Sequence, residues 1–217
     1  MNGDKLIIRE DFRRVANEIV TLLLEDIRQK KTRYIISIAG ESGSGKSVTG
    51  LALADELLKY SIRSVVLSLD DYFVLPPRSN DEKRRMDSDW LGPHVEVHLD
   101  VLDQNLKDAI QGKTGITKPL VDYYANRIGE ETIDLAGIKV VIAEGTYTSL
   151  LKNLDTRIFI TRDWTDTLDD RYKRNRGNEA GDPFIEGVLA VEHKIIAGQK
   201  QLADILITRE FAVIKKD

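Results

Sequence analysis

Eight consecutive residues in the first quarter of the chain have the composition of a phosphate-binding loop. Gly40-Glu-Ser-Gly-Ser-Gly-Lys-Ser47 matches the pattern G-x-x-x-x-G-K-[ST]. Glycines let the backbone curl so that successive N–H groups point at phosphate oxygens, and the N-terminus of a following helix attracts the same anion. In this pattern Lys46 reaches the β- and γ-phosphates, and the Ser47 hydroxyl binds Mg²⁺. The sequence thus predicts a nucleotide site made by Gly40, Glu41, Ser42, Gly43, Ser44, Gly45, Lys46, Ser47 and Val48.

Acidic residues end two of the predicted strands. Asp70 and Asp71 follow the apolar run at 64–69, and Glu144 follows the run at 139–143. Ligands of open α/β sheets bind at the carboxyl ends of strands, so Asp70 could accept a proton from an attacking hydroxyl or hold the metal. Glu144 could reach the Mg²⁺ shell directly or through water, and the glycine after it would allow close backbone approach. The alternative is that these acids only cap turns.

A charged segment late in the chain supplies candidate cations. A helix is predicted over 163–176, in which Arg171 and Arg174 lie three residues apart and share a face. Phosphoryl transfer spreads negative charge over equatorial oxygens, which arginines stabilise. The alternative is a solvated helix face whose arginines are balanced by Asp166, Asp169 and Asp170.

The elements that must position these residues follow from the apolar pattern. Short apolar runs predict strands at 34–39, 64–69, 139–143, 157–161 and 203–208. Helical spacing predicts helices at 12–27, 48–60, 99–110, 163–176 and 183–198, the last with Phe184, Val188, Val191 and Ile195 on its buried side. This alternation indicates a parallel sheet covered by helices on both faces. The glycine-rich loop lies between a strand and a helix, which favours a nucleotide site over a simple glycine turn with an exposed lysine.

The middle of the chain has a less regular pattern. Residues 72–93 contain Pro76-Pro77, many charges and Trp90, and we predict a mobile loop with at most one helical turn. No linker is evident, so we expect one domain over 1–217. Within it we expect an N-terminal helical segment (1–33), an acceptor loop region (72–98) and a lid (163–182).

Composition excludes several classes of protein. The 217 residues include 32 basic and 36 acidic side chains, a net charge of −4, which argues against general nucleic-acid binding. The absence of cysteine excludes disulfides, thiolate metal sites and a cysteine nucleophile. No apolar run approaches the ~20 residues of a membrane span, and no targeting signal is evident, so we expect a cytoplasmic protein without membrane or nucleic-acid partners.

Taken in order, the motifs resemble those of the uridine kinase and phosphoribulokinase group of P-loop small-molecule kinases. The resemblance covers residues 34–208. It is carried by Ile38–Ser47, Leu67–Phe73, Pro119–Tyr124 with Arg127, Ile142–Gly145, Arg171–Arg174 and Ala203–Ile207. It implies a P-loop NTPase-like parallel sheet flanked by helices, with an inserted acceptor-binding region and a helical lid.

The resemblance also implies roles for the candidate residues. ATP and Mg²⁺ would be used, with Asp70 as general base, Glu144 near the metal that Ser47 binds, and Arg171 and Arg174 closing over the phosphates. Asp70, Lys46, Arg171 and Arg174 are therefore the candidate catalytic residues. Candidate contacts with the acceptor are Asp71, Tyr72, His94, Tyr123 and Arg127.

The acceptor is the least specified part of this hypothesis. Val121 replaces an aromatic residue of uridine kinases, Ala125-Asn126 stand where a histidine is expected, and Leu91-Gly-Pro-His94 replaces an Asp-His-Pro segment. A small-molecule acceptor, in first place a nucleoside, is predicted; ribulose 5-phosphate, glycerate and pantothenate are alternatives, and a homo-oligomer is possible. A regulatory GTPase or ATPase and a non-catalytic binding protein are the competing classes, although the chain has no guanine-reading Asn-Lys-x-Asp segment.

Overall fold

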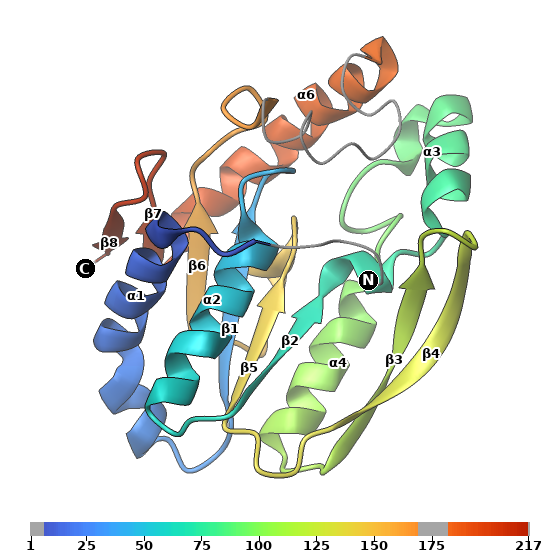
Figure 1. Cartoon of the computed structure of the whole chain (residues 1–217). Coiled ribbons are helices and arrows are strands. Elements are labelled where there is room, and N and C mark those ends of the chain that lie inside the picture. Colours follow the sequence, from blue (N-terminus) through green and yellow to red (C-terminus); the bar gives the residue numbers. More distant parts are fainter. Residues whose placement is uncertain (1–6, 169–181, 217) are drawn as a thin grey trace.

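The computed structural model describes residues 7–168 and 182–216. In this part of the chain, six strands form one sheet in the order β2-β5-β1-β6-β7-β8 (Figure 1). They are β1 (Tyr34–Gly40), β2 (Ser64–Ser68), β5 (Val140–Glu144), β6 (Thr156–Ile160), β7 (Ile205–Ile207) and β8 (Val213–Lys215). All neighbouring pairs are parallel except β7 and β8. The predicted parallel sheet is confirmed, and β8 is an antiparallel edge strand that the sequence pattern did not predict.

Two hydrophobic clusters cover the two faces of this sheet. Ile36 and Ile38 of β1 pack with α1 (Glu10–Gln29) and α2 (Lys46–Lys59) in one cluster. Ile35 and Ala39 of the same strand pack with α4 (Leu99–Ile110) and with Ile196 of α6 (Pro183–Ala197) in the other. Alternate side chains of a strand point to opposite faces, so a strand buried on both sides must be apolar throughout. This explains why short continuous apolar runs marked the strands.

The predicted N-terminal helix has the buried face that its spacing indicated. Every apolar residue of that pattern is buried: Phe12, Val15, Ala16, Ile19, Val20, Leu23 and Ile27.

The helix predicted at 183–198 is also present as α6, but its buried face differs from the expected one. Val188, Leu189, Glu192 and Ile196 are buried, whereas Val191 is 45% exposed. A buried glutamate belongs to this face, and an apolar pattern could not include it.

The region predicted as a mobile loop is largely structured, and that prediction is wrong. A 3₁₀ turn at Leu69–Tyr72 is followed by α3 (Pro77–Met86) and a second short turn at Ser88–Trp90. Proline at the first position of α3 and basic residues in its last turn both favour a helix there. Asn80 is the only buried residue of α3, so the sequence has no apolar stripe from which this helix could be predicted.

Two further differences concern the middle and late parts of the chain. An unpredicted antiparallel hairpin, β3 (Gly115–Asp122) with β4 (Arg127–Asp134), lies beside α4 (Figure 1). The helix predicted from residue 163 does not begin there, because 164–167 form a turn in which the Asp163 carboxylate accepts hydrogen bonds from the N–H groups of Thr165 and Asp166. Residue 168 is helical, and residues 169–176 lie outside the described residues. No helix in the described ranges is both long and apolar enough to cross a membrane.

Candidate active site

The glycine-rich loop connects β1 to the N-terminus of α2, as the motif requires. Gly45 immediately precedes α2 with φ +104°, a conformation that favours glycine, and a Cβ there would lie 2.7 Å from the Phe12 ring. The Lys46 ammonium donates a hydrogen bond to the Glu41 carbonyl at 2.8 Å. The 14-residue helix directs its N-terminal N–H groups into the loop. The arrangement can therefore hold an anion such as a phosphate.

The side chain of Glu41 fixes this loop to the rest of the protein. Its carboxylate accepts hydrogen bonds from the backbone N–H of Trp164 at 2.8 Å and from His193 Nδ1 at 2.7 Å. The Thr167 hydroxyl donates to the carbonyl of Ser42 at 3.0 Å. Glu41 belongs to the predicted nucleotide site, but its carboxylate is occupied by these structural bonds, and only its backbone faces Lys46.

Ser47 and Glu144 are brought together at the ends of α2 and β5. The Ser47 hydroxyl donates to Glu144 Oε2 at 3.1 Å. Burial, and next the nearby Asp70 carboxylate, raise the pKa of Glu144. A hydroxyl and a carboxylate are oxygen ligands of the kind that Mg²⁺ prefers, and Mg²⁺ commonly keeps few protein ligands besides phosphate and water. These two residues fit a Mg²⁺ ion, although the described residues contain no cluster of three or more His, Cys, Asp or Glu side chains that could hold a metal alone.

A cavity of about 190 Å³ opens beside the loop. It is bounded by the loop, the end of β2, helix α3, the hairpin and helix α6. Its lining residues are Ser42, Asp70, Phe73, Leu75, Pro77, Asn80, Asp81, Arg84, Tyr123, Thr146, Ile185, Val188, Leu189 and Glu192. Because Ser42 of the phosphate loop and Asp70 share this cavity, a molecule inside it would lie next to a phosphate bound on the loop.

Only one of the five predicted acceptor contacts, Tyr123, lines the cavity. Tyr72 does not line the cavity: its side chain is fully buried and its hydroxyl donates to Asn105 Oδ1 at 2.9 Å. Asp71 does not line the cavity either: it is buried and forms a 2.7 Å ion pair with Lys118 of the hairpin. Adjacent acids therefore face different ways, Asp70 to the cavity and Asp71 to the core.

The remaining predicted site residues are exposed or undescribed. His94 is exposed and does not line the cavity. The Arg127 side chain is 75% exposed, 3.5 Å from Asp122 within the hairpin, and also lies outside the cavity. Arg171 and Arg174 lie outside the described residues.

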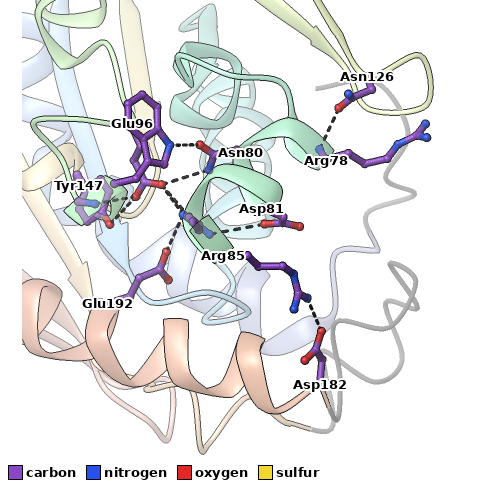
Figure 2. Close-up of polar contacts among 12 residues, drawn as sticks. Arg78, Asn80, Asp81, Arg85, Glu96, Asn126, Tyr147, Asp182 and Glu192 are labelled. Atoms are coloured by element: carbon purple, nitrogen blue, oxygen red, sulfur yellow. Dashed lines mark hydrogen bonds and ion pairs between the residues drawn. The ribbon is translucent and has the colours of Figure 1, made fainter. Parts of the chain in front are cut away.

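Sequence reasoning missed a buried polar network on the wall of this cavity (Figure 2). Arg84 of α3 donates from Nε to Glu96 Oε2 at 2.8 Å and from Nη2 to Glu192 Oε1 at 3.3 Å. Glu96 is fully buried and also accepts from Asn80 Nδ2, the Gly92 N–H and the Tyr147 hydroxyl. The only signal in the sequence was Glu192 itself, a charged residue at a buried helical position between Leu189 and Ile196.

A family model and several known proteins match most of this chain. The profile of the Phosphoribulokinase / Uridine kinase family matches residues 35–210. The chain is 29% identical over 197 residues to a bifunctional alpha-galactosidase/sucrose kinase of Mediterraneibacter gnavus, covering 86% of this chain but only 21% of that protein. It is 30% identical over 183 residues to a uridine kinase of Macrococcus caseolyticus, covering 80% of this chain and 86% of the relative.

A solved structure with a similar fold is that of a possible uridine kinase from Bacillus stearothermophilus. It has a TM-score of 0.66 and 15% sequence identity, and the match covers 90% of this chain and 98% of that one. The parallel sheet, the phosphate loop and the match over residues 35–210 all indicate the same family. The chain belongs to the Phosphoribulokinase / Uridine kinase family of P-loop kinases.

Proposed function

We propose that this protein transfers the γ-phosphate of ATP to a hydroxyl group of a small molecule. The observation that supports this most directly is the shared cavity: Asp70 and Ser42 of the phosphate loop both line it. The acceptor hydroxyl would lie between the Asp70 carboxylate and the bound γ-phosphate. Asp70 would orient this hydroxyl and take its proton while the new O–P bond forms, the bond from the γ-phosphorus to the bridging oxygen breaks, and ADP leaves.

The remaining roles follow from charge. Lys46, now bonded to the Glu41 carbonyl, would turn to the β- and γ-phosphate oxygens. Ser47 and Glu144 would hold Mg²⁺, directly or through water, and the ion would neutralise charge on the phosphates. Arg171 and Arg174 remain predicted to stabilise the transferred group from a lid. Water must be excluded during transfer, because an open site would hydrolyse ATP.

Replacing Ser47 with alanine tests the metal assignment. The variant loses one oxygen ligand, so the Mg²⁺ concentration needed for half-maximal activity is expected to rise about tenfold or more. The measurement is a Mg²⁺ titration of ATP consumption at saturating ATP. Ser149→Ala is the matched control, since that buried hydroxyl has no partner in the described residues. An unchanged Mg²⁺ requirement in Ser47→Ala would remove Ser47 from the metal site.

The acceptor is proposed to be a nucleoside, as in the uridine kinases that match most of this chain. A sugar is the second candidate, because a relative of similar identity carries a sucrose kinase activity in its name and the cavity wall has polar groups suited to hydroxyls. The test is ATP consumption with and without uridine, other nucleosides, sucrose, fructose, ribulose 5-phosphate, glycerate and pantothenate. Stimulation by one acceptor supports the kinase, and rapid hydrolysis without any acceptor supports a nucleotide-dependent switch.

A further inference from the structure

Glu192 occupies an unusual position for a carboxylate. It lies on the buried face of α6, is only 9% exposed and lines the acceptor cavity. One oxygen, Oε1, accepts from Arg84 at 3.3 Å. Within the described residues its other oxygen, Oε2, has no hydrogen-bond partner. The side chain is 12% exposed, so the carboxylate has lost much of its hydration, and its unpaired oxygen can accept a hydrogen bond from a molecule in the cavity.

The ion pair with Arg84 does not explain why this carboxylate is present. Arg84 already binds Glu96, which is fully buried and held by three further donors. Burial and repulsion by Glu96 and Asp70 raise the pKa of Glu192 to about 7, although Arg84 opposes the rise. One guanidinium thus serves three carboxylates, Glu96 at 2.7 Å, Glu192 at 3.3 Å and Asp81 at 3.9 Å, so negative charge is in excess. Buried groups with such perturbed titration concentrate at functional sites.

The charges around the cavity restrict what can enter it. Among the described lining residues, three are acids and one is a base: Asp70, Asp81, Glu192 and Arg84. The positive charge of Arg84 is balanced by fully buried Glu96, 2.7 Å away. An acceptor with its own phosphate or carboxylate would be repelled, whereas hydroxyl groups can donate to the free carboxylate oxygens.

We infer that Glu192, oriented by Arg84, binds a hydroxyl group of the acceptor and makes this site specific for uncharged polyhydroxylated acceptors. The inference rests on the proposed function. It places the acceptor between two carboxylates: Asp70 faces the hydroxyl that is phosphorylated, and Glu192 faces a second hydroxyl of the same molecule. Anionic acceptors such as glycerate or ribulose 5-phosphate are excluded by the same charges.

The test is Glu192→Gln with the acceptor that stimulates the wild-type protein most. A lost hydrogen bond between a hydroxyl and a charged group predicts a rise in acceptor KM of about tenfold to a hundredfold. The KM for ATP is expected to stay within about twofold, because the phosphate loop is untouched. Glu130→Gln is the matched control, since Glu130 is exposed on β4 away from the cavity.

The pH dependence gives a second readout that a structural role would not produce. The wild-type acceptor KM is expected to fall as pH rises through about 7, where Glu192 becomes ionised, and this change should disappear in Glu192→Gln. Asp70 is retained in both proteins, so the difference between their profiles reports Glu192. The charged and titratable groups that act on Glu192 are Arg84, Glu96, Lys46, Asp70 and Tyr147, and none is altered by the substitution.

The possible outcomes separate the two proposals. If no acceptor stimulates ATP consumption by the wild-type protein, the proposed function fails and this inference fails with it. If an acceptor is found but it is anionic, or if Glu192→Gln leaves both KM and its pH dependence unchanged, only this inference is overturned. A thermal melt at pH 8 separates misfolding from lost binding: the variant is expected to melt no lower than wild type, because it removes an excess buried charge. If Glu192→Gln melts lower and loses ATP affinity as well, Glu192 is a structural residue and the inference is overturned.

Discussion

Asp70→Asn is expected to lower the rate of phosphoryl transfer by about 10²- to 10⁴-fold while leaving ATP affinity nearly unchanged. Asparagine has almost the same shape as aspartate, but its amide cannot take the proton of the attacking hydroxyl. The groups proposed to hold ATP are in the loop at Gly40–Ser47, and this substitution does not alter them. The measurements are single-turnover transfer to the acceptor and calorimetric titration with Mg²⁺–ATP.

Asp71, the residue next to Asp70, provides the control variant for this experiment. Asp71 also accepts a hydrogen bond from the Val121 N–H at 3.1 Å, in addition to its ion pair with buried Lys118. Asp71→Asn leaves the buried Lys118 ammonium with a weaker set of partners, so a lower melting temperature is expected. Asp70→Asn should melt near the wild-type temperature. Near-normal turnover in Asp70→Asn would show that another group accepts the proton.

The two adjacent acids show where sequence reasoning reaches its limit. Both follow the same strand, and nothing in their spacing distinguishes the catalytic candidate from the structural one. The partner of Asp71 is Lys118 in β3, a hairpin that the sequence did not predict. Its second strand, β4, is exposed at most positions, so it lacks the apolar alternation by which a half-buried strand is recognised.

The parts of the fold that were predicted are those in which one local pattern decides the structure. Strands buried on both faces are continuous apolar runs, α1 buries one apolar stripe, and the phosphate loop is eight consecutive residues. No single local pattern decides the polar wall of the cavity. Arg84 comes from α3, Glu96 from the segment that precedes α4, and Glu192 from α6. Their relation is visible only after the chain has folded, and polar side chains at buried positions do not alter an apolar pattern in a recognisable way.

Gly145→Ala is expected to reduce both stability and activity, because Gly145 packs against Leu69, which immediately precedes Asp70. Gly145 follows Glu144 with φ +154°, and a Cβ there would lie 2.2 Å from the Cβ of Leu69, the residue before Asp70. Backbone strain and overpacking together predict a loss of about 3 kcal/mol in the free energy of unfolding. Moving Leu69 also moves Asp70, and a displacement of about 1 Å at a reacting group can cost about 10²-fold in rate.

Chemical denaturation and transfer kinetics of the same Gly145→Ala preparation measure both effects. Gly187→Ala is the control, since Gly187 lies within α6 and an added Cβ would have no atom within 4 Å. That variant is expected to gain about 0.5–1 kcal/mol, as alanine favours the helix. If Gly145→Ala were as stable and as active as the wild-type protein, the close approach of β5 to the Leu69 turn would not be what positions Asp70. If it lost stability alone, the position of Asp70 would be independent of this contact.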